Sequence, residues 1–293
     1  MTVEYPHLPV LLHEVIEALK PRPDGIYVDA TVGPGGHSEH LLKDIGPGGR
    51  LIGIDRDEAA LEIAEKRLSD KRIILRRGSF SDMENLLHAD GISAVDGILF
   101  DLGVSMLQFR DLERGFSFAS DERLDMRMDN RQKLSAWHVV NTYSEKELNR
   151  ILWEYGEERL SHKIAAAILR SRNKKTIDTC SALVDIVENV YGGRGRLHPA
   201  TKTFQALRIE VNRELEQLSL GLEAAQRLLK QGGRLCVISY HSLEDRIAKR
   251  FIADSSKKGI LKIITKKPLT ASPEELRFNP SSRSAKLRAA EKI

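Results

Sequence analysis

Three glycines and a histidine near the N-terminus are the residues whose types most favour ligand binding. The segment Val28–Ser38 reads VDATVGPGGHS and joins a short apolar run to a stretch with helical periodicity. A strand that turns into a helix through glycines presents bare backbone N–H groups and the positive helix end to a ligand. Glycine permits this close approach and the positive φ angles that such turns often require. A tight turn without a ligand is the alternative interpretation of this segment alone.

An acidic residue further along the chain makes a ribose-bearing cofactor the better interpretation. Asp55 ends the apolar run Leu51–Ile54 and follows Gly35 by 20 positions. In a nucleotide-binding βαβ unit, the acid that ends the second strand binds the ribose hydroxyls. Asp55 alone could be a solvated loop acid before a helix, so its spacing from the glycine turn carries this prediction.

Apolar runs alternate with helical patterns around these residues. The runs expected to form strands cover residues 25–29, 51–55, 72–76, 95–101 and 234–239. Strands that alternate with helices predict an α/β fold with a doubly wound, mostly parallel sheet and a ligand at the carboxyl ends of the strands. Asp29, Asp55 and Asp101 each end an expected strand, so we expect the three carboxylates to lie along one edge.

This arrangement resembles the S-adenosylmethionine site of the Rossmann-like methyltransferases. The resemblance implies that Asp55 binds the ribose and that Phe80 lies against the adenine. It also implies that the amino-acid part of the cofactor is approached by Gly35, Gly36 and His37. A nicotinamide-dependent oxidoreductase would share the glycine turn, but we find no Tyr-x-x-x-Lys pair placed for hydride transfer.

The middle of the chain predicts a separate helical domain. Residues 135–190 have only helical periodicity, in patterns over 136–141, 145–155, 157–170 and 180–190. We therefore expect a substrate-recognising helical insertion over 111–204, between core segments 1–110 and 205–293. Acidic and basic residues alternate along these helices, which is typical of a solvated face. A single long helix, from about 198 to 230, is expected to return the chain to the core.

Charge is distributed unevenly along the chain. The formal net charge is +4, but residues 241–293 hold 13 Lys and Arg against 6 Asp and Glu, whereas the remainder holds 33 against 36. A basic segment on a near-neutral body suggests a polyanionic partner, and a solvated tail is the alternative. The candidate phosphate contacts in this segment are Arg283, Lys286 and Arg288.

Other sequence features indicate a cytoplasmic protein without a metal centre. No stretch approaches the roughly 20 apolar residues of a membrane helix, and the first residues lack the pattern of a signal peptide. Cys180 and Cys236 lie far apart and have no metal-type spacing, so we expect both to be small core residues.

Eight motifs, taken together, point to a known family. In chain order they are VDATVGPGGHS, DLGVS, ERGFSF, LDMRMD, YGEER, HPATKTFQALRIEVNREL, ISYHSLEDR and NPSSRSAKLR. They resemble the bacterial MraW (RsmH) family, which methylates the N4 amino group of a cytidine in 16S ribosomal RNA. The resemblance covers about residues 7–292. It implies a class I S-adenosylmethionine methyltransferase fold with a helical insertion, S-adenosyl-L-methionine as cofactor, and the decoding centre of the small ribosomal subunit as target.

Individual roles follow from the motif positions. The residues implied to bind the cofactor are Gly35, Gly36, His37, Asp55, Phe80, Asp101 and Gln108. Met106 departs from the family, in which a second serine more often follows DLGVS. A homodimer is compatible with the sequence. Methylation of another RNA, a protein or a small molecule is the alternative function, and a non-catalytic RNA-binding module would not need acid-ended strands.

Methylation of a cytosine amino group needs alignment and a proton acceptor. The amino nitrogen is a poor nucleophile because its lone pair is delocalised into the ring, and positioning alone can supply about 7–11 kcal/mol. Asp101 and His241 are the candidate proton acceptors. A backbone carbonyl is the alternative acceptor, and helix capping is the alternative role for His241. The cytidine must leave its stack to react. Candidates to stack on it, or to be plain core residues, are Phe116, Phe118 and Tyr240.

Overall fold

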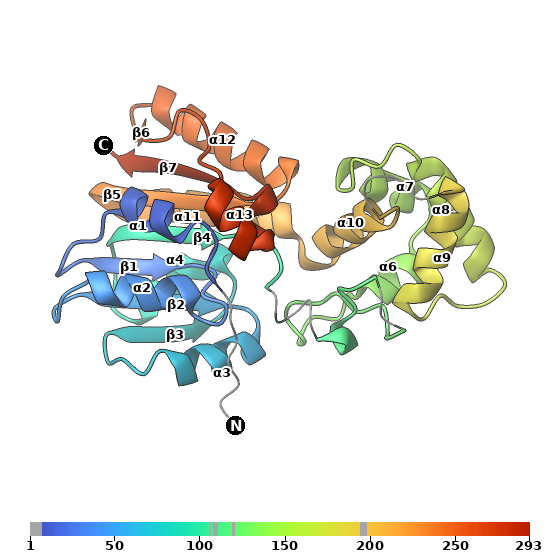
Figure 1. Ribbon diagram of the computed structural model, residues 1–293, viewed down its shortest axis with the longest axis horizontal. Coiled ribbons are helices and arrows are strands. Elements are labelled where there is room, and N and C mark those ends of the chain that lie inside the picture. The colour runs from blue at the N-terminus through green and yellow to red at the C-terminus, as the bar shows by residue number, and fades with distance from the viewer. Residues whose placement is uncertain (1–7, 106, 108–110, 119–120, 194–197) are drawn as a thin grey trace. The chain divides into compact units, whose positions relative to one another are not determined.

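The computed structural model describes residues 8–293 except 106, 108–110, 119–120 and 194–197. The chain forms two compact units, of which one comprises Met1–Gly103 with Leu215–Ile293 and the other comprises Val104–Glu214. The first unit holds the sheet and the second is helical (Figure 1). Within the described parts of the chain, no helix combines the length and the apolar character needed to cross a membrane.

Seven strands of the described residues form one sheet, in the order β3-β2-β1-β4-β5-β7-β6. Neighbours among β1 to β5 run parallel, whereas β7 pairs antiparallel with β5 and β6. This confirms the expected mostly parallel sheet. The strands are β1 (Ile26–Asp29), β2 (Arg50–Asp55), β3 (Ile73–Arg77), β4 (Val95–Asp101), β5 (Leu229–Ser239), β6 (Leu261–Ile263) and β7 (Lys286–Lys292).

Helices cover both faces of this sheet, because strand side chains alternate between the faces. Val28 and Ile52 share one apolar cluster with side chains of α4 (Met83–Ala89) and α11 (Glu214–Leu228). Tyr27 and Leu51 lie in a second cluster with α1 (Leu12–Leu19) and α2 (Gly36–Asp44). Two-sided burial confirms the doubly wound arrangement. The other elements of this unit are α3 (Glu58–Arg67), η1 (Phe80–Asp82), α12 (Ser242–Lys257), α13 (Pro273–Phe278) and η3 (Pro280–Ser284).

The C-terminal part of the sheet differs from the sequence prediction. β5 begins at Leu229 rather than at residue 234, and β6 and β7 were not among the expected strands. β7 lies between β5 and β6, and its Leu287 and Ala289 are buried. The last residues of the chain are therefore an inner strand of the sheet and not a free basic tail.

Both cysteines are core residues, as expected. Cys180 lies in the helical unit and Cys236 on β5, and both are free and buried. Burial raises the pKa of each thiol to about 12. Because the thiolate is the reactive form, neither side chain is poised for nucleophilic chemistry.

The second unit packs its helices around one apolar core, drawn from Leu148, Ile151, Ile164, Ile168, Leu183, Leu207 and their neighbours. Three of the expected helices agree with the structure to within one residue, whereas α8 begins at Ser161 and not at 157. Glu157 has a φ of +47°, which ends any helical run at that point. The elements are η2 (Leu112–Arg114), α6 (Ala136–Thr142), α7 (Glu145–Glu154), α8 (Ser161–Arg172), α9 (Cys180–Tyr191) and α10 (Thr201–Asn212).

The prediction of a single helix from 198 to 230 is wrong. α10 ends at Asn212, and Arg213 adopts the left-handed conformation with a φ of +51° before α11 begins. Phe204 and Leu207 on α10 belong to the core of the helical unit. The unit therefore begins at Val104 and ends at Glu214, where the sequence had placed its limits at 111 and 204.

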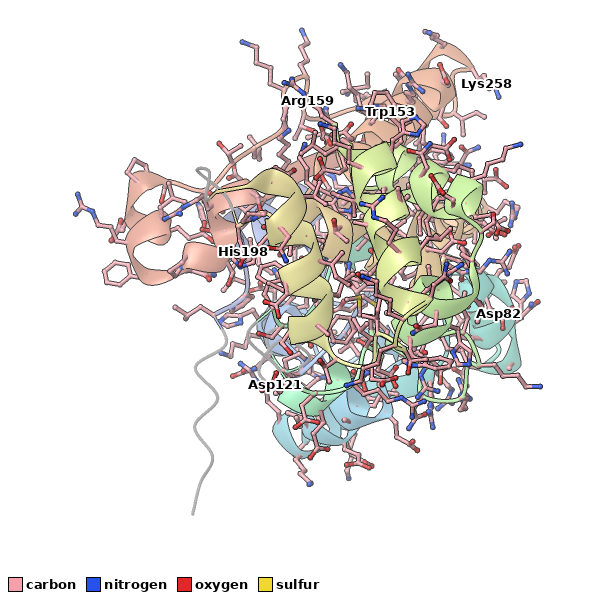
Figure 2. All side chains as sticks on the ribbon, turned by 90° about the vertical axis from the view of Figure 1, so that its right-hand side faces the viewer. Asp82, Asp121, Trp153, Arg159, His198 and Lys258 are labelled. Carbon is pink, nitrogen blue, oxygen red and sulfur yellow. The ribbon has the colours of Figure 1, made fainter. Side chains whose placement is uncertain are left out.

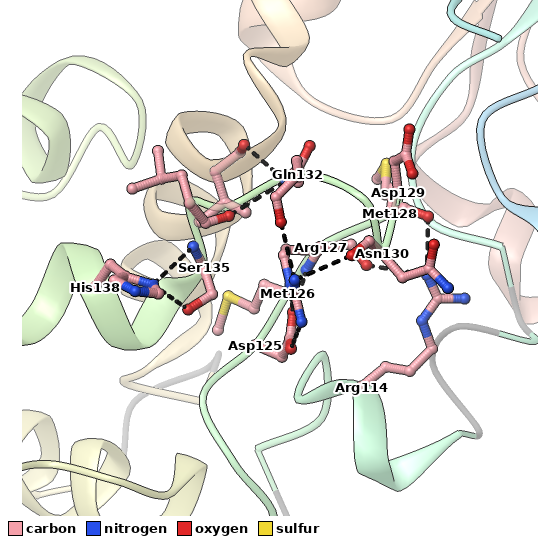
Figure 3. A network of polar contacts seen from close by, with 12 residues as sticks. Arg114, Asp125, Met126, Arg127, Met128, Asp129, Asn130, Gln132, Ser135 and His138 are labelled. Carbon is pink, nitrogen blue, oxygen red and sulfur yellow. Dashed lines mark hydrogen bonds and ion pairs between the residues drawn. The ribbon is translucent and has the colours of Figure 1, made fainter.

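A polar network holds the extended segment before α6 (Figure 3). The Arg127 guanidinium binds the two carboxylate oxygens of Asp125 at 2.6 and 2.7 Å. It also donates to the carbonyl oxygens of Asn130 and Gln132, at 3.2 and 2.9 Å. Inside this segment, Met126 is fully buried with a φ of +61°. A strained residue of this kind persists only where its surroundings hold it, which is the role of the network.

Candidate cofactor and catalytic site

Three carboxylates lie at the carboxyl edge of the sheet, as their spacing predicted. Asp29 ends β1, Asp55 ends β2 and Asp101 ends β4. Asp29 lies opposite Gly53 on β2 and Leu99 on β4, so the three strand ends are neighbours. Ligands of open α/β sheets bind outside this edge.

Asp55 fixes the glycine turn between β1 and α2. Its Oδ2 accepts a 2.9 Å hydrogen bond from the Gly33 N–H, and its Oδ1 accepts one of 2.9 Å from the Asp57 N–H. Gly33 and Gly35 have φ values of +50° and +85°. Among the described residues, an ideal Cβ on Gly33 would meet only the Thr31 carbonyl oxygen, at 3.9 Å. The backbone at Gly33 is thus open to a polar ligand group that approaches the start of α2.

Replacing Gly35 by alanine should destabilise the protein by about 2–4 kcal/mol. A side chain at a φ of +85° costs about 1–2 kcal/mol. The new Cβ would also lie 2.7 Å from Leu68 Cδ1, well inside van der Waals contact. Unfolding in urea, followed by far-ultraviolet circular dichroism, measures the loss in free energy of unfolding.

Two further variants separate strain from clash. Gly91 has a φ of +71°, and no atom of the described residues lies within 4 Å of its ideal Cβ, so Gly91→Ala should cost only about 1 kcal/mol. Removing the Leu68 side chain relieves the clash at Gly35. The double variant Gly35→Ala/Leu68→Ala should therefore be less destabilised than the sum of its single variants. Strict additivity would contradict the predicted clash.

Asp101 lies between two polar side chains from distant parts of the sequence. The Tyr240 hydroxyl donates a 2.7 Å hydrogen bond to Asp101 Oδ1, and His37 Nδ1 lies 3.5 Å from Asp101 Oδ2. The other ring nitrogen of His37, Nε2, lies 2.9 Å from the Val10 carbonyl oxygen. A carbonyl oxygen only accepts, so we assign the ring proton of His37 to Nε2.

Burial changes the protonation of these groups. It raises the pKa of Asp101 to about 7, in spite of the opposing hydrogen bond from Tyr240. It also raises the pKa of Asp29 to about 6 and lowers the pKa of His37. At neutral pH His37 is therefore neutral, with a lone pair on Nδ1, and Asp101 is close to half protonated. A carboxyl group that titrates near neutral pH can take up or release a proton during a reaction.

Comparison with known proteins identifies the family of the chain. The model of the MraW methylase family matches residues 4–293. This chain belongs to that family. The ribosomal RNA small subunit methyltransferase H of Persephonella marina is 51% identical over 98% of this chain and 99% of its own length. The protein of the same name from Caldicellulosiruptor bescii is 48% identical over 99% of this chain and all of its own.

Membership of the MraW methylase family confirms the resemblance carried by the sequence motifs and makes the chain a methyltransferase. Among solved structures, an rRNA methylase from Streptococcus thermophilus is 12% identical and covers 96% of this chain and 93% of that chain, with a TM-score of 0.45.

The sheet edge of this MraW-family chain suits S-adenosyl-L-methionine, the methyl donor. The bare turn at Gly33 leaves room for a ligand, and the Asp55 carboxylate has lone pairs beyond its two backbone hydrogen bonds for ribose hydroxyls. Gly35 and Gly36 fit the same turn through their place at the start of α2.

Phe80, the residue expected beside the adenine, is mainly a core residue. Its side chain is 8% exposed and meets Phe100 edge-on, with ring centroids 5.4 Å apart. An ideal Cβ on Gly221 of α11 would lie 2.7 Å from its ring, so the helix approaches closely. The Arg56 guanidinium lies 5.7 Å from the ring centroid. Only a small exposed part of Phe80 remains for a cofactor.

His241, the second candidate catalytic residue, caps α12. Its Nδ1 accepts a 3.4 Å hydrogen bond from the Glu244 N–H, and its Nε2 lies 3.2 Å from Glu244 Oε1. In return, Glu244 Oε2 accepts hydrogen bonds from the N–H groups of Tyr240 and His241, at 2.8 and 3.3 Å. This reciprocal pattern is a capping box, which matches the alternative role that the sequence left open.

The basic C-terminal segment of this methylase is only partly exposed. The prediction that Arg288 contacts phosphate is wrong, because its side chain is buried and binds Asp245 at 2.6 and 3.2 Å. Lys286 Nζ lies 3.7 Å from the same carboxylate. Pairing of β7 with β5 buries Arg288, whereas the Lys286 side chain is 42% exposed and Arg283 in η3 is exposed.

The aromatic candidates for stacking lie among protein groups. Phe116 is 4% exposed in the core of the helical unit. Phe118 stacks on His198 with ring centroids 4.8 Å apart and meets Phe204 edge-on at 5.0 Å. The Tyr240 hydroxyl is bound to Asp101. The two remaining positions singled out from the sequence, Met106 and Gln108, lie outside the described residues.

Proposed function

We propose that this chain transfers a methyl group from S-adenosyl-L-methionine to the N4 amino group of a cytidine in 16S ribosomal RNA, in the decoding centre of the small ribosomal subunit. The observation that carries the proposal is the full-length match to relatives named ribosomal RNA small subunit methyltransferase H, at 51% and 48% identity. Asp55, Asp101 and the bare turn at Gly33 support it. The reaction takes place where ribosomal subunits are found, in the cytoplasm.

The residues of the chain bind and orient the reactants. When bound, S-adenosyl-L-methionine supplies an activated sulfonium methyl group. Asp55 would accept hydrogen bonds from the ribose hydroxyls, and backbone N–H groups at the start of α2 would bind the carboxylate of the amino-acid part. Positioning and exclusion of water by these groups can lower the barrier by about 7–11 kcal/mol.

Asp101 is the better placed of the two proposed proton acceptors. Its Oδ1 already accepts from Tyr240, whereas its Oδ2 lies 3.5 Å from His37 Nδ1, longer than an ordinary hydrogen bond. A pKa of about 7 lets Oδ2 take the proton released from the cytosine amino nitrogen at neutral pH. His241 Nδ1 caps α12, whereas its Nε2 has no hydrogen-bond partner among the described residues, and we assign His241 a capping role.

A label-transfer experiment tests this function. Small ribosomal subunits, naked 16S rRNA and a protein extract are each incubated with S-adenosylmethionine carrying a labelled methyl group, and the products are digested to nucleosides. We expect the label in N4-methylcytidine. Asp55→Ala should lower the rate by about 10- to 100-fold, because it removes a charged hydrogen-bond acceptor and the support of Gly33.

Asp44→Ala provides the matched control, because Asp44 is an exposed carboxylate at the end of α2 and the variant should keep full activity. Label in another nucleoside, in protein or in a small molecule would overturn the proposed substrate and keep the methyltransferase. Equal rates for Asp55→Ala and Asp44→Ala would overturn the role given to Asp55.

A further inference from the structure

The segment around α8 carries charge of only one sign. Residues 159–175 contain six Lys and Arg and no Asp or Glu. The alternation of charge expected along these helices therefore fails here. The six cations are Arg159, Lys163, Arg170, Arg172, Lys174 and Lys175.

Five of these six cations are exposed, and two of the five share one side of α8. α8 buries Ile164, Ala165 and Ile168 against the core. Lys163 and Arg170 are seven positions apart, about two helical turns, so they share the exposed side of the helix. Arg159 precedes this stripe, and Lys174 and Lys175 extend it past the helix end, all three exposed. Arg172 differs, because it donates to the Val140 carbonyl oxygen.

An exposed tryptophan comes shortly before the first of these cations in the chain. Trp153, near the end of α7, is 61% exposed. The chain then reverses, because Glu157 has a φ of +47° and the Glu158 N–H donates to the Leu152 carbonyl oxygen at 3.1 Å. The reversal is followed at once by Arg159, six positions after Trp153, and both side chains are exposed; Figure 2 labels the two residues. Indole and guanidinium thus flank one turn of the chain and are both open to solvent.

Two of the acids near Trp153, Glu154 and Glu158, are already engaged. Glu158 is 1% exposed and accepts a 2.7 Å hydrogen bond from the Tyr191 hydroxyl. Glu154 binds Arg150 at 3.1 Å. The cations of 159–175 are thus not neutralised by these neighbouring carboxylates.

Helix stability does not account for the pattern. Cations near the C-terminus of α8 interact favourably with the helix dipole, which suits Arg170. Lys163, in the first turn, lies at the end of the dipole that disfavours a cation, and Arg159 precedes the same end. The exposed indole of Trp153 likewise lacks the stabilisation that burial of its apolar surface would give. These features instead suit a ligand with phosphate charges and flat bases.

We propose that Trp153 and the adjoining cations form a docking surface for the RNA substrate, a proposal that rests on the rRNA methyltransferase function argued above. Trp153 stacks on an unpaired base, and Arg159, Lys163, Arg170, Lys174 and Lys175 contact phosphates along the strand. Aromatic side chains beside a basic stripe are the usual platform for single-stranded nucleic acid. An acidic protein partner would use the cations but gain little from a stacked indole.

Intrinsic fluorescence tests the stacking directly. The chain has two tryptophans, Trp137 and Trp153, so Trp137→Phe leaves Trp153 as the single reporter. Titration with transcribed 16S rRNA should quench its emission. In the wild-type background, Trp153→Ala should weaken binding of that RNA by about 5- to 150-fold, while Trp153→Phe keeps most of the affinity. Trp153 is exposed, so the melting temperature should not change.

Salt dependence tests the phosphate contacts. Each contact to a single strand adds about 0.7 to the slope of log affinity against log salt concentration. Lys163→Gln/Arg170→Gln/Lys174→Gln should lower that slope by about 2. A control with three exposed lysines of the sheet unit changed to glutamine should leave it almost unchanged; these are Lys20, Lys66 and Lys71.

The outcomes separate this surface from the proposed function. Methylation of 16S rRNA by the wild type, with unaltered RNA affinity in the Trp153→Ala and triple-glutamine variants, would overturn the surface alone. An equal loss in the control variant would reduce the effect to net charge and also overturn it. Absence of methyl transfer to rRNA by the wild type would overturn the function.

Discussion

Replacing Asp101 by asparagine should stabilise the protein above pH 7 while removing most of its activity. Asparagine has the shape and hydrogen-bonding pattern of the protonated carboxyl. Its oxygen can accept from the Tyr240 hydroxyl, and its NH₂ group can donate to the unprotonated Nδ1 of His37. The contacts of Asp101 in the folded protein are thereby kept, without a buried charge.

The sign of the effect follows from the pKa of Asp101. Burial raises it from 3.8 to about 7, so between these values the folded protein holds a proton that the unfolded chain has released. Stability therefore falls as the pH rises from about 4 to about 7, and Asp101 costs about 2–4 kcal/mol above that range. Asp101→Asn carries no charge at this position, so its stability does not fall in this way as the pH rises. Urea unfolding at several pH values should give a difference in free energy that is largest at pH 8 and closes toward pH 4.

Activity should move in the opposite direction to stability. Loss of the proposed proton acceptor should lower kcat by about 100-fold or more. The wild-type rate should rise with pH through about 7, as Asp101 ionises, and this rise should be absent from Asp101→Asn. Tyr240→Phe is the matched control, because it keeps Asp101 and removes a hydrogen bond that lowers its pKa. Its rate profile should shift to higher pH. An unchanged profile in both variants would contradict the role of Asp101.

The sequence was sufficient where local signals determine the structure. The glycine turn needs residues that adopt a positive φ, and Gly33 and Gly35 both do. Asp55 could be assigned to the same edge because an apolar run directly precedes it. What could not be predicted is the set of contacts around Asp101, since Tyr240 approaches it from 139 positions away. The pKa of Asp101, about 7, results from its burial in the folded protein and cannot be predicted from the order of residues.

Long-range pairing explains the errors in the fold. β7 reads KLRAAEK, a composition without strong strand preference, and it becomes a strand because it pairs with β5. The sequence predicted Arg288 to be a free cation, because its ion-pair partner Asp245 lies 43 positions away in the chain. The helix break at Arg213 could not be predicted, because no glycine or proline lies at this position or next to it. It arises because α10 packs in the helical core, whereas Leu218 and Leu222 of α11 pack in the sheet core.

Asn212 was not singled out from the sequence, and replacing it by alanine should destabilise the helical unit by about 3–5 kcal/mol. Its buried side chain accepts a 2.9 Å hydrogen bond from the Met128 N–H and donates to the carbonyl oxygens of Met126 and Arg208, at 2.7 and 2.9 Å. Truncation leaves two buried backbone groups without these partners, at about 1–3 kcal/mol each. It also releases Met126, whose φ of +61° needs external support.

Tryptophan fluorescence is the appropriate measurement, because Trp137 and Trp153 both lie in the helical unit. Urea unfolding followed by this signal should show a lower midpoint for Asn212→Ala. The matched control is Asn173→Ala, an exposed asparagine of the same unit, which should change the free energy of unfolding by less than about 0.5 kcal/mol. Equal midpoints for the two variants would contradict the argument. A lower midpoint for Asn212→Ala alone would mean that this one side chain of α10 holds two distant segments, LDMRMD and EVNREL, together in one folded unit. The sequence shows these segments only as separate patterns.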